Sequence, residues 1–254
     1  MKPVSRNGEA IRAKEEPVRL SCMVAGLLIA FVLPIQPGLE VPTMFLALLG
    51  LSPDTASGVA AIAYEIGTAL LIVALVRYWE HLPLSSIGIG RFSIGDAVAA
   101  VLVFFADLVV TPKIWALLQG STVLANAAQS LRAEQEGISS WPILIGVGIA
   151  ISISFAEEFG ARAYAIERLS AAIGNRAIGA GVAFIAALSM HVPRRGLAYL
   201  PIVAPGQLLL VLLYLWRRNT WSCVLAHLLM DTYAMVIEPL LPLATLMFLK
   251  RLGI

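Results

Sequence analysis

The stretch SFAEEFGAR, residues 154–162, places two adjacent carboxylates and an arginine at the end of an apolar segment. The preceding residues, 141–156, contain no charged side chain. Ionisable groups inside a membrane segment are costly, so they usually face the interior of a helical bundle or a wet cavity, where they carry function. The alternative is that Glu157 and Glu158 only mark the end of a span, where charge returns to water. The rest of the chain favours the functional interpretation.

The composition is that of a membrane protein. The chain has 254 residues, of which 59% are hydrophobic and 13% are charged, and its mean hydropathy is +0.85. A soluble domain carries about 25% charged residues. Because a spanning helix needs about 20 apolar residues, we predict an all-α, polytopic helical bundle with about seven to eight transmembrane helices. The net charge of only +2 indicates no nucleic-acid partner. Cys22 and Cys223 lack CxxC spacing, which argues against a disulfide or a zinc-thiolate site.

The chain divides into a tail and a membrane domain. Residues 1–19 are polar, and no small-x-small cleavage site follows the apolar run from Leu20, so we expect an uncleaved, cytosolic tail. Residues 20–254 are predicted to form a single membrane domain with its motif-bearing core at about 141–237. Residues 42–50 are too short to span and are expected to be interfacial or re-entrant. The expected spans, followed by a short final helix, are about 20–35, 56–78, 95–118, 142 into the Glu157 stretch, 176–191, 199–216 and 221–237.

Basic residues in short loops predict the orientation, because such residues favour the cytosolic side. If the spans alternate, the tail and most loop arginines fall on one side, with Arg132 and the Arg194-Arg195 pair as exceptions. We therefore predict an integral, multi-pass protein of a cytoplasmic or cell membrane with a cytosolic N-terminus. The basic residues on that side are those of the tail, Arg77, Arg91, Arg168, Arg176, Arg217, Arg218, Lys250 and Arg251.

The charged stretch itself divides into two roles on a continuous helix. Glu158 and Arg162 are spaced i, i+4 with the acid N-terminal, which is the favourable order for an ion pair. Glu157 is rotated from Glu158 by about 100° at 3.6 residues per turn. Arg162 is therefore expected to neutralise and fix Glu158, which leaves Glu157 freer to act on a substrate or a water molecule.

A histidine follows at a matching depth. The turn at Gly174-Asn175 lies midway in the sequence between Glu157 and His191. If the two segments form an antiparallel hairpin, both residues lie at the same depth, which allows contact without proving it. The alternative is a histidine at a helix end that is hydrogen-bonded locally before Pro193.

A second histidine shares a helix face with an acid. His227 and Asp231 are spaced i, i+4, so Asp231 can accept from one imidazole nitrogen and set the orientation of the ring. The alternative is a polar pair that ties this span to a neighbour. Glu65 and Asp107 also lie inside spans without an obvious partner in their own helices, and we interpret them as structural groups or as supports of the site.

Taken in order, these motifs resemble the CAAX protease and bacteriocin-processing family, the type II CAAX prenyl endopeptidases and their prokaryotic relatives. The family pattern is Glu-Glu-x-x-x-Arg, then Phe-x-x-x-His, then His-x-x-x-Asn or Asp. This chain has Glu157, Glu158 and Arg162, then His191, then His227 and Asp231. It departs where the usual Phe-Arg-Gly reads Ala161-Arg162-Ala163, and where the aromatic four residues before His191 is Ala187, with Phe184 nearby.

The resemblance implies a role for each motif residue. Glu157 would activate the attacking water with His191 as its partner, while Glu158 and Arg162 would hold the site together. His227 and Asp231 would face the developing oxyanion. An ionised aspartate cannot donate a hydrogen bond, so Asp231 is either protonated or orients His227, and we favour the second. We predict catalysis without a metal or other cofactor. The alternative is zinc held by Glu157, His191 and His227, although no HExxH motif is present.

We therefore expect an intramembrane endopeptidase, resembling the CAAX prenyl endopeptidases, that cleaves a membrane-associated or prenylated protein or peptide near the cytosolic face. Its expected partners are membrane lipid and a peptide or lipidated-protein substrate; the sequence does not define an oligomeric state. One alternative is a non-catalytic relative with an immunity or scaffolding role. Another is a proton-coupled transporter with Glu65, Asp107, Glu157 and Glu158 as relay groups, but no inverted repeat is visible.

Overall fold

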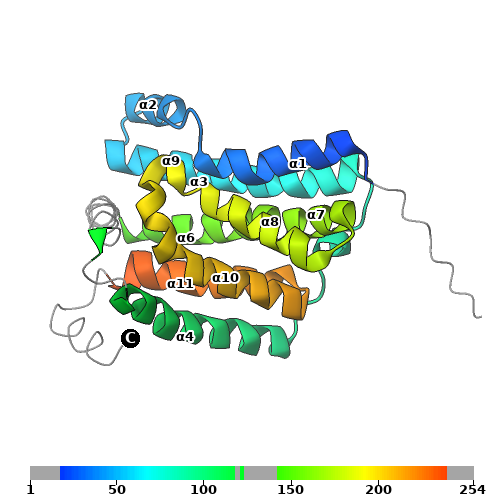
Figure 1. Cartoon of the computed structure of the whole chain (residues 1–254). Helices are drawn as coiled ribbons and strands as arrows, with labels where there is room; N and C mark the ends of the chain where they lie inside the picture. The colour runs from blue at the N-terminus through cyan, green and yellow to red at the C-terminus, as the bar shows by residue number, and fades with distance from the viewer. Residues whose placement is uncertain (1–17, 118–120, 123–141, 239–254) are drawn as a thin grey trace, which may run out of the picture.

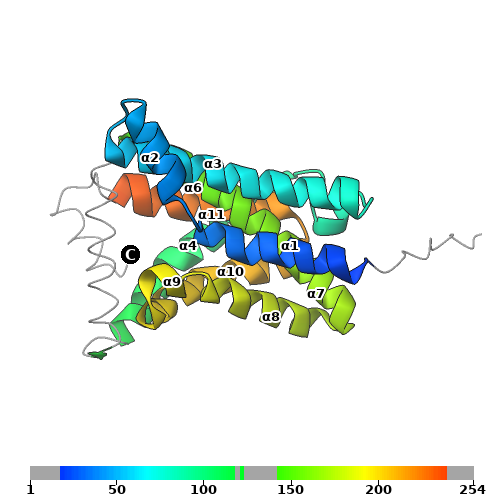
Figure 2. The ribbon, with the colours of Figure 1, turned by 90° about the horizontal axis from the view of Figure 1, so that it is seen from above.

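The computed structural model describes residues 18–117, 121–122 and 142–238, and all the regular elements in this part of the chain are helices. Long helices run along one axis and pack side by side (Figure 1). Viewed from above, α3, α6 and α11 lie on one side of the bundle, and α8 and α10 lie on the other (Figure 2). The elements of the first half are α1 (Leu20–Val32), η1 (Leu33–Ile35), α2 (Glu40–Leu48), α3 (Pro53–Ala74), η2 (Leu75–Trp79), η3 (Leu84–Ile87) and α4 (Ile94–Leu117).

The second half of the chain supplies the centre of the bundle. Helix α6 packs on α3 and α11, α7 packs on α8, and α4 covers α10 and α11. The elements are α6 (Ile143–Glu157), η4 (Glu158–Tyr164), α7 (Ala165–Ile173), α8 (Arg176–Ser189), α9 (Val192–Arg195), η5 (Leu197–Tyr199), α10 (Leu200–Arg217), α11 (Thr220–Thr232) and η6 (Tyr233–Ile237).

The all-α, multi-pass prediction is confirmed, but the predicted count of seven to eight spans is too high for the described residues. Five helices are long and apolar enough to cross a membrane, or up to six if one bent pair counts as a span. Helix α8 is the main reason, because its 14 residues are shorter than the roughly 20 that a span needs. The expected final helix lies outside the described residues.

The bent pair lies at the first predicted span. Residues Leu20–Ile35 and Glu40–Leu48 are both apolar, and their axes differ by 53°. The sequence predicted one span followed by an interfacial or re-entrant segment. In the structure this segment forms a second helix, α2, which packs on α3 (Figure 1). The bend fits either one broken span or the predicted re-entrant segment.

The predicted hairpin between Glu157 and His191 is present. Gly174 ends α7 in the left-handed conformation (φ 74°), and the Asn175 side chain accepts a hydrogen bond from the backbone N–H of Ile178 to begin α8. Antiparallel packing of α7 and α8 then follows from the short turn. The two helices are in close contact, since a Cβ at Gly179 would collide with the backbone of Ser170. The hairpin brings His191 back toward the level of the charged stretch.

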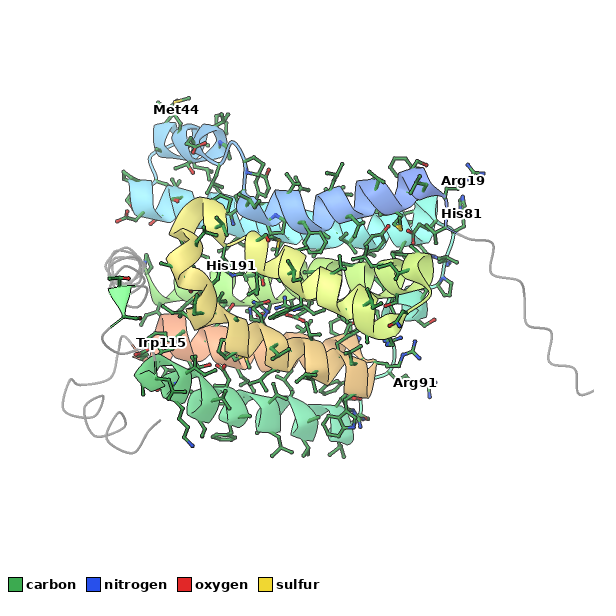
Figure 3. The ribbon with its side chains drawn as sticks, in the orientation of Figure 1. Arg19, Met44, His81, Arg91, Trp115 and His191 are labelled. Atoms are coloured by element: carbon green, nitrogen blue, oxygen red, sulfur yellow. The ribbon has the colours of Figure 1, made fainter. Side chains whose placement is uncertain are left out.

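Arginines gather at one end of the bundle, hereafter the arginine-rich end, where α3, α7 and α10 finish and α4 and α8 begin. Arg19, His81 and Arg91 lie there, whereas Met44 and Trp115 lie at the other end (Figure 3). Two buried carboxylates hold this end together: Glu80 pairs with Arg168 at 2.7 Å, and Asp96 pairs with Arg217 at 2.9 Å. The loops thus carry the charge asymmetry that the sequence predicted, and the Lys250-Arg251 pair lies outside the described residues.

Candidate functional site

The charged stretch adopts a π-helical turn. Helix α6 ends at Glu157 and continues as the π-helix η4, Glu158–Tyr164. In a π-helix the hydrogen bonds run from i to i+5, so residue 162 comes back over residue 157 as well as residue 158. Arg162 Nη1 accordingly lies 3.2 Å from Glu157 Oε2 and 3.0 Å from Glu158 Oε1. The predicted Arg162–Glu158 pair is present, but Arg162 also pairs with Glu157, a contact that the spacing of a continuous α-helix did not predict.

The two acids, Glu157 and Glu158, differ in burial. The side chains of Glu158 and Arg162 are completely buried, whereas that of Glu157 is 13% exposed. A buried charge is tolerated only when paired and hydrogen-bonded, and Arg162 supplies that pairing for both carboxylates. Glu157 is the acid that a water molecule or a substrate can reach. It lies 14 residues into the Ile143–Ile173 span, about 21 Å along the helix from Ile143.

His227 joins α11 to the charged stretch. Its Nδ1 lies 2.7 Å from Glu158 Oε1 and donates to that carboxylate. Its Nε2 lies 3.4 Å from Asp231 Oδ2, an oxygen that makes no hydrogen bond to any described residue. The i, i+4 spacing thus does bring Asp231 to the ring, but Glu158 makes the closer contact. Sequence spacing could not show this, because Glu158 and His227 are 69 residues apart.

His191 is fixed by its own helix end and by an aromatic ring. Its Nδ1 lies 3.1 Å from the carbonyl oxygen of Ala187. A carbonyl only accepts, so Nδ1 carries the proton and the Nε2 of the neutral ring is an acceptor. The ring stacks on Tyr199 at a centroid distance of 6.0 Å. No hydrogen bond or ion pair joins His191 to Glu157 among the described residues, but the two lie close enough to interact electrostatically.

Gln207 is a site residue that sequence reasoning missed. It is buried in α10, where its Oε1 accepts from Arg162 Nη2 and its Nε2 donates to Glu157 Oε2 at 3.4 Å. One carboxamide therefore contacts both members of the Arg162–Glu157 pair. The available signal was an amide within an apolar span, since the 13 residues 201–213 contain no other side chain capable of donating a hydrogen bond.

The two isolated acids lie outside this network. Glu65 accepts a hydrogen bond of 2.7 Å from Gln36, which ties α3 to the end of the first helical segment. Asp107 accepts from Thr111 at 2.6 Å, so it does have a partner in its own helix, contrary to the prediction. Its carboxylate faces Gly206 of α10, next to Gln207, and it interacts electrostatically with His227. Asp107 thus borders the site.

The sequence that builds this site matches the model of a known family. Residues 139–233 match the family described as type II CAAX prenyl endopeptidase Rce1-like. This part of the chain is an Rce1-like domain. The resemblance recognised from the three motifs is therefore confirmed, and all six motif residues lie within the matched range. No match was found among curated proteins or among solved structures.

The positions where the chain departs from the family pattern lie in packed contacts. Ala161 and Ala187 are almost fully buried and pack with Met190 against Phe31 and Ile35 of the first helical segment. The carbonyl oxygen of Ala187, not its side chain, holds the His191 ring. The substitutions in the Rce1-like domain therefore change the packing around the site and leave its polar groups in place.

The arrangement does not present a preformed metal site. Among the described residues, no group of three or more His, Cys, Asp or Glu side chains is arranged to hold a metal ion. His227 Nδ1 is directed at Glu158 and His191 Nδ1 at Ala187, so only their Nε2 atoms remain for other partners. The zinc set of Glu157, His191 and His227 that the sequence left open is not assembled in this structure.

Proposed function

We propose that the chain is an intramembrane endopeptidase that hydrolyses a peptide bond of a membrane-associated or lipidated substrate. The observation that supports this most is the division of the buried network into a fully enclosed part and an accessible part. Glu158 and Arg162 are enclosed, while Glu157 is partly exposed and His191 and His227 interact with it electrostatically. Acids, bases and hydrogen-bond donors that lie together around one accessible group are the usual composition of a hydrolytic site.

In this proposal Glu157 is the general base. Its carboxylate takes a proton from a water molecule, whose oxygen forms a bond to the scissile carbonyl carbon while the carbonyl becomes an oxyanion. His191, with Nε2 as an acceptor, orients the water. Glu157 then returns the proton to the leaving amine as the carbon–nitrogen bond breaks. Proton transfer by a positioned carboxylate contributes about 10²–10⁴-fold to such rates.

His227 is the group best placed to stabilise the oxyanion. An imidazolium donates from both ring nitrogens. Nδ1 is held by Glu158 at 2.7 Å, so Nε2 is the donor that can point toward the substrate. Asp231, at 3.4 Å from Nε2, lies beside that donor and fits the orienting role that the sequence favoured. A preorganised donor at an oxyanion is worth about 10²–10³-fold in kcat.

Peptide cleavage by the protein reconstituted in liposomes tests the proposal. The substrates are farnesylated peptides ending in a CAAX sequence and their unprenylated counterparts. We expect Glu157→Gln and His191→Ala to abolish cleavage, while Glu40→Gln, at an exposed position on α2, leaves it unchanged. Cleavage that survives in both site variants would overturn the proposal. A folded wild-type protein that cleaves none of these peptides would favour the non-catalytic relative.

The topology remains part of the proposal. We propose that the arginine-rich end faces the cytosol, because basic residues in short loops favour that side. Six loop arginines that the sequence assigned to one side, Arg77, Arg91, Arg168, Arg176, Arg217 and Arg218, belong to segments at this end. Labelling of single cysteines introduced at Arg77 and at Ser52 with a membrane-impermeant reagent distinguishes the two orientations.

A further inference from the structure

A second polar site lies at the arginine-rich end, away from the Glu157 network. A hollow of about 270 Å³ opens between the end of α10 and the loop that precedes α4. It shares no residue with the proposed active site. Its lining includes Arg91, Arg217, Arg218, Asp96, Asn219 and the backbone of Gly88.

The charge of this hollow is positive. It contains three arginines and one aspartate. Asp96 is engaged by Arg217 at 2.9 Å, and Arg218, whose side chain is 64% exposed, approaches Glu167 only to 3.7 Å. The exposed Arg91 side chain makes no hydrogen bond or ion pair within the described parts of the chain. Two guanidinium groups are therefore available to an anion, and planar guanidinium groups match phosphate oxygens well.

The walls of the hollow are fixed by hydrogen bonds. Asn219 Nδ2 donates to the carbonyl oxygen of Arg91 and to Asp96 Oδ2, both at 2.9 Å. The backbone N–H of Thr220 donates to the carbonyl of Gly88 at 3.0 Å. Two loops distant in sequence are thus held together, so an anion would meet a preformed site and little ordering would be needed on binding.

The backbone at Arg218 gives independent support. Arg218 ends α10 in the left-handed conformation with φ of 51°, a position that helices usually fill with glycine because a Cβ is strained there. Residues held in such sparsely populated conformations cluster at ligand sites. Here the strained conformation keeps a charged side chain at the rim of the hollow.

The surroundings indicate a lipid. The hollow lies where one candidate span ends at Arg217 and another begins at Ile94, the depth of lipid headgroups. Trp216 is 65% exposed with the Arg217 guanidinium over its ring, and Trp is enriched at membrane interfaces. Helix α4, which begins beside the hollow, exposes apolar side chains along which acyl chains can lie: Ile94, Val98, Val101, Leu102 and Phe105.

We propose that this hollow binds the phosphate group of an anionic phospholipid. Arg91 and Arg218 contact the phosphate oxygens, and the acyl chains run along the exposed face of α4. Basic pockets between membrane helices on the cytosolic side suit anionic headgroups, and the site would hold the arginine-rich end in that leaflet. The proposal does not depend on peptide cleavage.

Native mass spectrometry of the detergent-purified full chain tests the site. The probes are phosphatidylglycerol, phosphatidylcholine and inorganic phosphate. We expect wild type to retain one phosphatidylglycerol that phosphatidylcholine does not replace, and Arg91→Gln with Arg218→Gln to weaken this binding at least tenfold. Arg77→Gln, which removes an exposed charge at the same end, is the matched control and should bind as wild type does.

A second variant separates binding from folding. Arg218→Gly removes the guanidinium and relieves the left-handed strain, so we expect it to raise the melting temperature in lipid-free detergent while weakening phosphatidylglycerol binding severalfold. Equal retention by wild type and the Arg91/Arg218 variants would overturn the proposal. So would displacement of the lipid by millimolar inorganic phosphate with equal affinity, which would identify a free-phosphate site instead.

Discussion

Glu158 Oε1 lies 2.7 Å from His227 Nδ1 and 3.0 Å from Arg162 Nη1. One buried carboxylate oxygen therefore contacts both a guanidinium and an imidazole, and through the imidazole it connects the π-helical turn η4 to α11. At this contact Glu158 is enclosed, while Glu157 remains partly exposed. This difference separates the two acids experimentally, because their loss should affect different quantities.

Loss of Glu158 should mainly affect stability. Glu158→Gln removes a fully buried charge that both Arg162 and His227 contact, and removal of one partner of a buried pair costs about 3–5 kcal/mol. We expect the free energy of unfolding in detergent, measured by denaturant titration, to fall by about that amount. Glu157→Gln is the control and should cost less than half as much while it abolishes cleavage. Equal destabilisation by the two variants would contradict the division of roles.

Gln207 should position the Arg162–Glu157 pair without contacting substrate. In Gln207→Leu both contacts to the pair are lost, so Glu157 has more orientations available. We expect kcat to fall by about tenfold with KM within twofold of wild type, since an interaction needed only in the transition state affects kcat alone. Gln207→Glu tests the role further, because it keeps an acceptor for Arg162 but places a third carboxylate beside Glu157. A rise in KM alone would assign Gln207 to substrate binding.

Gly26 allows α1 to pack closely against Tyr164 of η4, and a larger residue there should weaken this packing. A Cβ at Gly26 would collide with the ring of Tyr164, which is fully buried and hydrogen-bonded to Cys22 O and to Glu80. Gly26→Ala should therefore reduce the free energy of unfolding by about 1–3 kcal/mol. The same substitution at the helical Gly181, where a Cβ meets nothing within 4 Å, should stabilise by about 0.5–1 kcal/mol. An unchanged free energy of unfolding in Gly26→Ala would show that α1 can shift away from Tyr164 at no cost, against this prediction.

Much of the site could be predicted from residue types and spacing, whereas its connections could not. Ionisable residues within apolar spans stand out because burying them in a membrane costs free energy, and this pattern pointed to Glu157, Arg162 and His227. The turn at Gly174-Asn175 predicted the hairpin, because a left-handed glycine followed by an Asn N-cap has few alternatives. The number of spans was predicted less well, since hydropathy does not distinguish a short apolar helix such as α8, with 14 residues, from a full span.

Two features depend on geometry that no local pattern shows. Nothing in SFAEEFGAR distinguishes a π-helical turn from an α-helical one. The turn packs closely on α1, where a Cβ on Gly160 would lie 3.1 Å from the Cα of Ala30, and no local pattern shows this contact. Because a π-helical turn spans five residues, it brings the Arg162 side chain within 3.2 Å of Glu157. The contacts of Gln207 with Arg162 and Glu157, and of Glu158 with His227, likewise depend on how α10 and α11 pack on the charged stretch in the tertiary structure.

Metal removal tests the mechanism that the sequence left open. In the proposed mechanism Glu157 activates the water without a metal, so we expect cleavage to survive exhaustive dialysis against EDTA and 1,10-phenanthroline within about twofold. Each chelator is also added after substrate, to exclude an effect on the liposomes. Activity that disappears on dialysis and returns only with Zn²⁺ would require Glu157, His191 and His227 to rearrange into a zinc set of the His₂Glu type.

Asp231 gives the most direct test of how His227 is used. The carboxylate lies 3.4 Å from His227 Nε2, and Oδ2 makes no hydrogen bond to any described residue. Asp231→Asn keeps an acceptor for the ring and adds a donor, so we expect kcat to stay within about tenfold of wild type. Asp231→Leu removes the orienting group and should lower kcat by about 10²-fold, the cost of one misplaced oxyanion donor. A double-mutant cycle with His227→Ala should show that Asp231→Leu has no further effect once the imidazole is gone. If Asp231→Asn lowers kcat as much as Asp231→Leu does, the negative charge itself is required, and Asp231 acts on the reaction independently of His227.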